Sequence, residues 1–445
     1  MPTSKSSSPA RSAAFGILLR VEEGAYASVL LATTDTDLSP VDRGLCYELV
    51  MGVLRHQLWL DRLVEVYAGR KIEKLDLRVR LILRLGLYQL RFLSRIPASA
   101  AVNESVKLVN VARMRSASGF VNAVLRRATR EPEVDPLSTV TDPLERISIK
   151  TSHPLWLLEK WASAFGVEEA AALAQANNGA PPVSFRVIRN RASTEEVISE
   201  LQKAGLGPTP SKIARNAWRC SKSAPLLLQM AAEGKIYLQD EASQLVPEVL
   251  GAKPNERVLD LCSAPGSKTT QIADEGSDRV RLVASDLHAH RLRTVSLAAS
   301  VQGLTNIHCL VVDGLKTLPF AEQSFDRVLV DAPCSGTGTL RRNPEIRWRL
   351  TAADIEDLSM RQQQLLSNAA ASVKTGGRLV YSTCSVEPEE NESVRQRFIE
   401  SNPHFESVEV NLNLPVFIKD GAARTWPHYH DTDGFFICAF ERETA

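Results

Sequence analysis

No apolar run in the 445 residues is long enough to cross a lipid bilayer, so we expect no association with membranes. The seven cysteines are few, scattered and odd in number, and no Cys-x-x-Cys pair is present. These absences argue against a zinc site and against a disulfide framework. Free thiols are typical of a reducing compartment, and we therefore expect a cytoplasmic protein that holds no metal.

The amino-terminal segment lacks acidic residues before Glu22, which is also a feature of transit peptides. It has no apolar core of the kind that signal sequences need, and it runs directly into a helical pattern. We interpret the first residues as a short disordered tail.

Charge is distributed unevenly along the chain. Residues 1–130 carry 20 Lys and Arg against 11 Asp and Glu, whereas the net charge of the whole chain is only +1. The rest of the chain is therefore acidic. A basic module of this kind is typical of proteins that bind a polyanion. A solvated helical surface is the alternative interpretation.

Helical patterns dominate the amino-terminal part of the chain. Ser39 and Pro40 supply an N-cap and a first-turn proline, and residues 75–93 are apolar on nearly all sides, which predicts a buried central helix. We assign residues 1–135 to an all-α bundle. A proline-containing linker follows, and residues 140–240 then mix helical and strand patterns, which predicts a small α+β module that links or binds RNA.

Residues 241–445 alternate short apolar runs with helical patterns, which predicts a parallel, doubly wound, Rossmann-like α/β sheet. The last two runs have no long helix between them, so we expect the final strand to enter antiparallel as a hairpin. The predicted strands are the runs ERVLDLC, RLVASD, IHCLVVD, FDRVLVDAP, GRLVYSTC, ESVEV and GFFICAF.

Ligands of such sheets bind beyond the carboxyl ends of the strands. The loop LDLCSAPGSKTT lacks both G-x-G-x-x-G and G-x-x-x-x-G-K-[ST], which disfavours a pyrophosphate or triphosphate ligand. Asp286 lies 20 residues after Gly266, a spacing that suits a carboxylate binding ribose hydroxyls, and Asp313 could accept from an adenine amino group. S-adenosylmethionine is a nucleoside cofactor without a phosphate chain, and its cation suits a site lined by acids.

Two cysteines occupy comparable places in the predicted sheet. Cys334 follows the run RVLVDAP, and Cys384 follows the run RLVYST. A single cysteine is most often a small buried core residue. Two cysteines at the ends of neighbouring strands would instead face one crevice, which points to a reactive pair.

These segments together resemble a known family. The motifs LDLCSAPGSKTT, DAPCSGTG and STCSVEPEENE, with RRNPEIRW and the terminal DGFFICAF, are similar to those of the RNA 5-methylcytosine methyltransferases. The amino-terminal bundle resembles the RNA-binding antitermination factor NusB, and the combination resembles the RsmB (Sun or Fmu) group, which methylates small-subunit ribosomal RNA. Ser267 and Asn343 stand where that family usually has glycine and commonly has histidine.

The resemblance implies an S-adenosylmethionine-dependent methyltransferase that acts on a cytosine of ribosomal RNA. It implies that Cys384 attacks carbon 6 of the base, which makes carbon 5 nucleophilic, and that Cys334 assists release of the product. It also implies that Asp331 binds or protonates ring nitrogen 3 and that Lys268 contacts the base or the cofactor; a solvated side chain is the alternative for this lysine. The residues expected to bind the cofactor are Cys262, Ser263, Ala264, Pro265, Gly266, Ser267, Lys268, Asp286, Asp313 and Asp331.

Two further expectations concern the segments after the cysteines. A helix predicted to start near Pro388 would direct its dipole at Cys384, although the neighbouring glutamates oppose that effect. After Cys334, four arginines are expected to hold the RNA backbone near a base flipped out of its stack, and Trp348 either stacks there or fills the core. The arginines are Arg341, Arg342, Arg347 and Arg349.

Other functions compete with this interpretation. A DNA cytosine methyltransferase would have no second cysteine after the later strand, and a nicotinamide oxidoreductase would need the missing glycine fingerprint. A methyltransferase of another RNA, such as transfer RNA, is an open alternative. So is a non-enzymatic RNA-binding adaptor with a relic site, against which intact Asp331, Cys334 and Cys384 argue. We expect a monomer whose partner is RNA.

Overall fold

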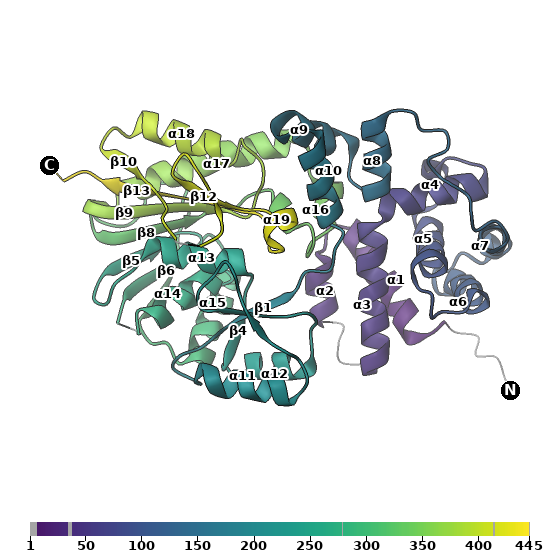
Figure 1. Cartoon of the computed structure of the whole chain (residues 1–445), viewed down its shortest axis with the longest axis horizontal. Coiled ribbons are helices and arrows are strands. Elements are labelled where there is room, and N and C mark those ends of the chain that lie inside the picture. The colour runs from purple at the N-terminus through teal and green to yellow at the C-terminus, as the bar shows by residue number, and fades with distance from the viewer. Residues whose placement is uncertain (1–6, 34–37, 278, 413, 445) are drawn as a thin grey trace. The chain divides into compact units, whose positions relative to one another are not determined.

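The computed structural model describes residues 7–33, 38–277, 279–412 and 414–444, and Figure 1 shows the chain. The expected amino-terminal tail therefore falls partly on residues 1–6, outside the described residues. Backbone contacts divide the chain into two compact units. The first unit holds residues 1–179 and 340–349, and the second holds residues 180–339 and 350–445.

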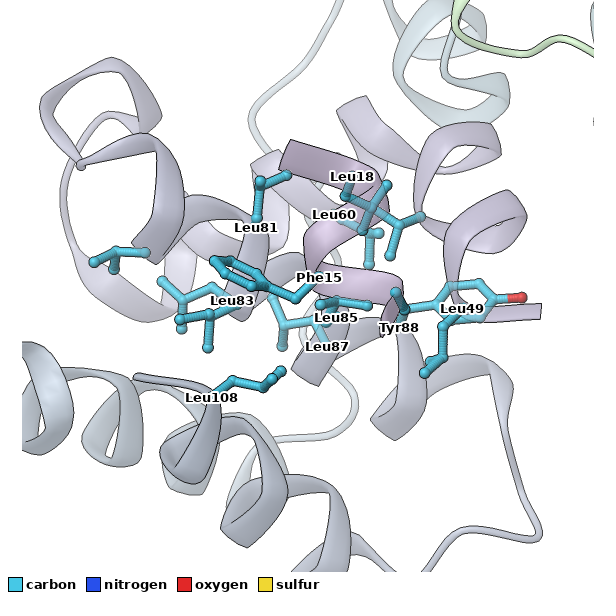
Figure 2. Packing of buried hydrophobic residues seen from close by; sticks show 14 of the residues in the cluster. Phe15, Leu18, Leu49, Leu60, Leu81, Leu83, Leu85, Leu87, Tyr88 and Leu108 are labelled. Carbon is cyan, nitrogen blue, oxygen red and sulfur yellow. The ribbon is translucent and has the colours of Figure 1, made fainter. Parts of the chain in front are cut away.

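The first unit is helical, as predicted for its amino-terminal part. Helix α5, Leu77–Phe92, is buried on nearly all sides, and Figure 2 shows its leucines packed with Phe15 and Leu108. Ser39 caps α3 by accepting from the Asp42 N–H, as predicted. The helices of this unit are α1 (Pro9–Glu22), α2 (Ala27–Thr33), α3 (Pro40–Arg55), α4 (Gln57–Ala68), α5, α6 (Ala98–Val111), α7 (Ser118–Arg130), α8 (Pro143–Thr151), α9 (Leu155–Phe165), α10 (Val167–Ala176) and α16 (Ile346–Arg349). None of the helices in the described part of the chain has both the length and the apolarity needed to span a membrane.

Helices α8 to α10 belong to this first unit, although the sequence places residues 140–240 in one α+β module. Helix α8 packs against α4 and α9, and its carboxyl end binds the buried side chain of Arg347. The α+β part proper is a four-stranded antiparallel sheet in the order β2-β3-β1-β4. Its elements are β1 (Val183–Val187), α11 (Thr194–Lys203), β2 (Thr209–Pro210), β3 (Ala217–Cys220), α12 (Pro225–Ala232) and β4 (Ile236–Leu238).

A nine-stranded mixed sheet forms the body of the second unit. Strands β5 to β9 are parallel in the order β9-β8-β5-β6-β7, and β13 is antiparallel to β9. Every strand predicted from an apolar run is present. Its elements are α13 (Glu241–Leu250), β5 (Arg257–Asp260), α14 (Ser267–Glu275), β6 (Arg281–Asp286), α15 (Ala289–Gln302), β7 (Ile307–Val311), β8 (Phe325–Asp331), α17 (Ala352–Ala370), β9 (Val373–Thr383), α18 (Glu392–Ser401), β10 (Phe405–Val408), β11 (Phe417–Lys419), β12 (Ala422–Thr425), α19 (Pro427–His430) and β13 (Phe435–Arg442).

The carboxyl-terminal strands differ in one respect from the prediction. Strand β13 is antiparallel and pairs with β10, as expected. The two are not joined by a simple hairpin, because β11, β12 and α19 lie between them along the chain. Strands β11 and β12 are only three and four residues long, which is too short for a clear strand pattern in the sequence.

Helices cover both faces of this sheet because alternate strand residues point to opposite sides. Val258 and Val380 pack with α13 and α14, whereas their neighbours Leu259 and Leu379 pack with α17. Full burial on both faces explains why the parallel strands read as continuous apolar runs.

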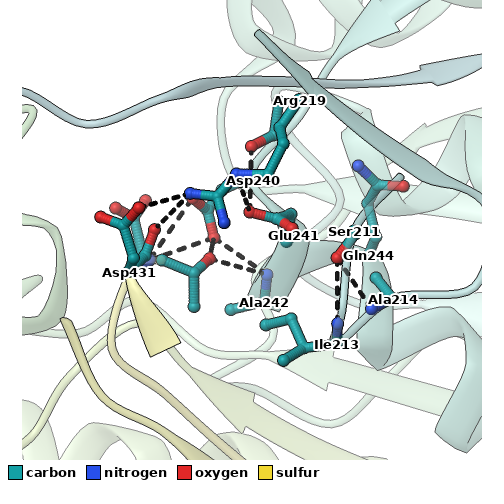
Figure 3. Close-up of polar contacts among 12 residues, drawn as sticks. Ser211, Ile213, Ala214, Arg219, Asp240, Glu241, Ala242, Gln244 and Asp431 are labelled. Atoms are coloured by element: carbon teal, nitrogen blue, oxygen red, sulfur yellow. Dashed lines mark hydrogen bonds and ion pairs between the residues drawn. The ribbon is translucent and has the colours of Figure 1, made fainter. Parts of the chain in front are cut away.

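The α+β module is fastened to the sheet by buried polar contacts. Arg186 of β1 is fully buried and donates to Thr270 at 2.8 Å, and its guanidinium lies 3.4 Å from the Asp274 carboxylate. At a second contact, shown in Figure 3, Arg219 of β3 lies between Asp431 and Glu241. The first contact is made with α14, the helix that follows the loop after β5.

Candidate active site

The loops after the five parallel strands gather at one edge of the sheet. Strands β8 and β9 are neighbours, with Asp331 of β8 opposite Ser382 of β9. Cys384 follows β9 directly, and Cys334 lies in the turn just after β8. The topology therefore brings together the two cysteines singled out in the sequence.

The sulfur atoms of Cys334 and Cys384 lie 3.3 Å apart, close enough to share a hydrogen bond. The hydrogen bond with Cys384, together with burial, raises the pKa of Cys334 well above its ordinary value. Cys334 therefore stays protonated at neutral pH and can donate to the sulfur of Cys384. The contact can form in either direction, because each thiol can act as a donor or an acceptor.

Lys268 and Asp331 form a partly buried ion pair beside the thiols. The Nζ atom of Lys268 lies 2.6 Å from Oδ2 of Asp331, and the Ser382 hydroxyl donates to Oδ1 at 2.7 Å. Only 9% of the Lys268 side chain is exposed, which excludes the solvated alternative for this lysine. Burial favours the neutral amine, but Asp331 and Cys384 together raise the pKa of Lys268 above its ordinary value. The site thus holds a cation whose charge acts on Cys384.

The loop between β5 and α14 makes a turn that requires glycine. Gly266 has a φ of +106°, and a Cβ atom there would lie 3.1 Å from the backbone of Val295 in α15. Thr269, in the first turn of α14, donates its hydroxyl to Asp260 at 2.7 Å. These contacts hold the predicted cofactor loop, Cys262–Lys268, against the carboxyl end of β5.

Asp260, the last residue of β5, is absent from the predicted set of cofactor-binding residues. Its Oδ1 atom is buried without a hydrogen-bond partner among the described residues, and so is the Ser263 hydroxyl. Burial raises the pKa of Asp260 to about 7, and the Asp331 and Asp286 carboxylates act in the same direction. Buried unpaired acceptors are costly, so these atoms fit a ligand that brings hydrogen-bond donors and positive charge.

Asp286 and Asp313 lie on the neighbouring loops. Asp286 is buried at the end of β6, accepts from the His288 N–H at 2.9 Å and pairs with Arg291 at 3.2 Å. It lies opposite Val311, the last residue of β7, so Asp313 follows two residues beyond the strand end. The structure therefore places both predicted carboxylates on adjacent loops at the same edge as Gly266.

The segment after Cys384 differs from the prediction. Helix α18 begins at Glu392, four residues later than the predicted start near Pro388, so the amino end of its dipole is also later in the chain than predicted. Glu387 and Glu390 are fully buried. In the turn before α18, the Thr383 hydroxyl donates to the side chain of Asn391, and the Ser385 hydroxyl donates to the side chain of Glu390. These hydrogen bonds hold residues 390 and 391 in the turn, so the helix begins only after them.

Three of the four arginines after Cys334 are placed differently from the prediction that they bind RNA, whereas RNA binding by Arg342 stays a prediction. Arg347 is fully buried and donates to the carbonyl oxygen of Ser152 at 3.0 Å and to the side chain of Asn178 at 3.0 Å. Arg341 is 4% exposed, and Arg349 donates to three backbone carbonyls of residues 21–25. Arg347 and Arg349 stabilise the first unit instead, because their guanidinium groups donate to carbonyl groups of its helix ends and turns.

One basic side chain of the bundle is likewise buried and paired with acidic residues of the bundle itself. Arg84 is buried between Asp61, with which it makes two hydrogen bonds, and Glu22. Other basic side chains of the bundle are exposed and available to a polyanion. They include Arg70, Lys71, Arg113, Arg115, Arg126 and Arg130.

Models of three families match this chain. Residues 247–441 match 16S rRNA methyltransferase RsmB/F, residues 8–130 match the NusB family, and residues 153–226 match the ferredoxin-like domain of RsmF/B-like methyltransferases. The crystal structure of PH0851 has a TM-score of 0.84 and 28% identity, covering 98% of this chain and 99% of that chain. A methyltransferase homologue from Pyrococcus horikoshii has a TM-score of 0.60 and 28% identity, covering 68% of this chain and 100% of its own.

Full-length relatives agree with these matches. The probable ribosomal RNA small subunit methyltransferase B of Bacillus subtilis is 36% identical, covering 97% of this chain and 98% of that protein. The protein of the same name from Synechocystis is 37% identical, covering 97% of this chain and 99% of that protein. The chain therefore belongs to the ribosomal RNA small subunit methyltransferase B family, and it is an rRNA methyltransferase.

Proposed function

We propose that this protein methylates carbon 5 of a cytosine in small-subunit ribosomal RNA, with S-adenosylmethionine as the methyl donor. The observation that carries the proposal is the pair of thiols, Cys334 and Cys384, whose sulfurs lie 3.3 Å apart at the ends of adjacent parallel strands. Carbon 5 of cytosine is a poor nucleophile, and addition of a thiolate to carbon 6 activates it.

The cofactor would lie along the loops after β5, β6 and β7. Asp286 and Asp313 would accept from the ribose and adenine groups, and the loop Cys262–Lys268 would line the site. The unpaired Oδ1 of Asp260 and the unpaired hydroxyl of Ser263 support this assignment, because a ligand with donors and a cation satisfies both. When bound, S-adenosylmethionine supplies an electrophilic methyl group on its sulfonium sulfur.

The residues at the ends of β8 and β9 would act on the base. Cys384 forms the bond from sulfur to carbon 6, and the displaced electron pair moves toward carbon 5 and ring nitrogen 3. Asp331 would bind ring nitrogen 3 of the base. Lys268 would keep the Asp331 carboxylate in place through their ion pair, and its positive charge would stabilise the thiolate of Cys384 before attack. Cys334 assists the final step, in which the proton on carbon 5 is removed, the electron pair of that C–H bond re-forms the double bond between carbons 5 and 6, and the bond between sulfur and carbon 6 breaks to release the Cys384 thiolate.

The remaining parts of the chain would bring the RNA to this edge. We propose that residues 1–135 act as an RNA-binding NusB-like domain, residues 140–240 as a linking or RNA-binding module, and residues 241–445 as the catalytic domain of a cytoplasmic monomer. The exposed basic side chains of the bundle support the first assignment.

The test is product analysis after incubation with labelled cofactor. Small-subunit ribosomal RNA, small-subunit particles and transfer RNA are each incubated with the wild-type chain and with Cys384→Ala. The expected result is labelled 5-methylcytidine in ribosomal RNA, with the wild-type chain only. Label in transfer RNA alone, or in another nucleoside, would overturn the proposal, and so would full activity of Cys384→Ala.

A further inference from the structure

One buried carboxylate connects the two turns that carry the cysteines. Ser335 follows Cys334, and Ser385 follows Cys384. The hydroxyls of both serines donate to Oε2 of Glu390, and the backbone N–H of Ser335 donates to Oε1 at 2.8 Å. Glu390 is therefore bonded to the residue after each thiol.

The carboxylate is itself held rigidly in place. Gln362 of α17 donates its amide to Oε1 of Glu390 at 2.8 Å, and the same amide nitrogen lies 2.9 Å from the carbonyl oxygen of Pro333. The hydroxyl of Tyr381 donates to the backbone carbonyl of Glu390 at 2.6 Å. Four side-chain and backbone donors thus converge on a fully buried carboxylate, which makes no ion pair within the described residues.

Asn391 fixes the Cys384 turn from the other side. Its Oδ1 atom accepts from the Thr383 hydroxyl at 2.6 Å, and its Nδ2 atom donates to the Ser385 carbonyl at 2.9 Å. The residues before and after Cys384 are therefore both bonded to Asn391, while Glu390 joins this turn to the Cys334 turn.

We propose that Glu390 is a positioning residue that holds the Cys334 and Cys384 turns together, so that the two thiols stay in contact through the catalytic cycle. This inference rests on the proposed function for its catalytic consequence, although the geometry of the dithiol can be tested without it. The negative charge of Glu390 also contributes to the raised pKa of Cys334, after the Cys384 hydrogen bond and burial.

A carboxylate suits this position better than an amide does. Each of its two oxygens accepts from two donors, whereas glutamine offers one acceptor oxygen and an amide nitrogen that meets the serine hydroxyls as a donor. Glu390→Gln keeps the volume of the side chain, but both serine hydroxyls would have to reverse and accept from an uncharged amide nitrogen in place of donating to a carboxylate. Glu390→Ala removes all four.

The experiment measures the dithiol and the catalysis separately. Phenylarsine oxide bridges two thiols only when they are in contact, so its binding reports on the pair without RNA or cofactor. Cys334→Ser identifies the signal that belongs to this pair. The matched control is Glu392→Gln, two residues further along, because Glu392 is half exposed and pairs with Arg424 instead. Thermal unfolding and cofactor binding are measured for every variant.

We expect Glu390→Gln to bind the arsenical at least tenfold more weakly than the wild-type chain. We expect kcat to fall roughly 10-fold to 100-fold while KM for RNA and the affinity for cofactor change less than twofold. Glu392→Gln should match the wild-type chain in all four measurements. Wild-type arsenical binding and wild-type kcat in Glu390→Gln would overturn the inference.

Two outcomes separate this inference from the proposed function. If the wild-type chain methylates no cytosine but Glu390→Gln loses arsenical binding, the positioning role stands and the proposed function fails. If Glu390→Ala does not fold, Ser335→Ala and Ser385→Ala replace it, since each deletes one hydroxyl and leaves the carboxylate. Each should weaken arsenical binding, and an unchanged affinity in both would contradict the role of Glu390.

Discussion

The ammonium of Lys268 lies 2.6 Å from the carboxylate of Asp331, and the Ser382 hydroxyl occupies the other oxygen of that carboxylate. We predict that Lys268→Met lowers kcat roughly 100-fold, or about 3 kcal/mol of transition-state stabilisation, because Asp331 loses its counter-charge and Cys384 loses a nearby cation. Lys253→Met, which alters an exposed lysine just before β5, serves as the control. Equal kcat values for the two variants would contradict a catalytic role for Lys268.

Removal of each thiol should block the reaction at a different step. We predict that Cys384→Ala abolishes turnover and forms no covalent complex, because no bond to carbon 6 can form. Cys334→Ala should attack the base, transfer the methyl group and then stall, so it accumulates a protein–RNA complex that survives denaturing electrophoresis. The double variant should lose the complex, since attack comes first. The reverse pattern would exchange the two roles.

Asp260 predicts a pH dependence of stability. Its pKa is about 7 in the folded chain and near 3.8 in the unfolded chain, so the folded state binds the proton more tightly. Between these values the folded chain holds more protons than the unfolded chain, and its stability falls as pH rises. A shift of this size corresponds to a loss of on the order of 4 kcal/mol at most.

Asp260→Asn should remove that contribution while keeping the acceptor for Thr269. Differential scanning calorimetry from pH 4 to pH 8 should therefore show the variant becoming more stable relative to the wild-type chain as pH rises. A constant difference across this range would show that Asp260 stays ionised in the folded chain.

Arg347 should be a stability determinant of the first unit. Arg347→Ala leaves the carbonyl groups of residues 151, 152 and 177 without the guanidinium that now satisfies them. We expect a local loss of about 3 kcal/mol, seen as roughly 100-fold faster hydrogen exchange in α8 to α10. Arg126→Ala, an exposed arginine of α7, should leave exchange there unchanged. Similar exchange in both variants would rule out this role.

The exposed basic residues of the bundle should set the salt dependence of RNA binding. Changing Arg70, Arg113 and Arg115 together to Gln should make the slope of log affinity against log salt shallower by about 2, as expected for three phosphate contacts to single-stranded RNA. The control changes Lys253, Arg279 and Arg281, which lie near the amino ends of the strands. Identical slopes for the two triple variants would show that the bundle is not the RNA anchor.

The strands and both cysteines could be predicted because their signals are local. A strand buried on both faces reads as a continuous apolar run, and the residue after each run lies at the ligand-binding edge whatever the order of strands. Asp286, Asp313, Cys334 and Cys384 were all found in this way. The contact of Cys334 with Cys384 needed only the additional fact that β8 and β9 are neighbours.

The roles of the charged residues could not be predicted in the same way. An acidic run such as the one around Glu390 normally indicates a solvated surface, and only the folded chain shows that serine hydroxyls from two distant turns satisfy it. Arginines beside a catalytic motif suggest RNA contacts. The partners of Arg347 are almost 200 residues away along the chain, and no local pattern encodes them.

The membership of residues 340–349 in the first unit has a consequence for synthesis on the ribosome. Residues 1–179 leave the ribosome early. The carbonyl groups in this segment that bind Arg347 cannot be paired until residues 180–339 and then Arg347 itself have been synthesised. At ordinary elongation rates this delay is roughly ten to thirty seconds. The contacts of Arg347 with the end of α8 and with the turn after α10 therefore cannot form in strict order of translation. Their completion coincides with emergence of the turn that carries Cys334.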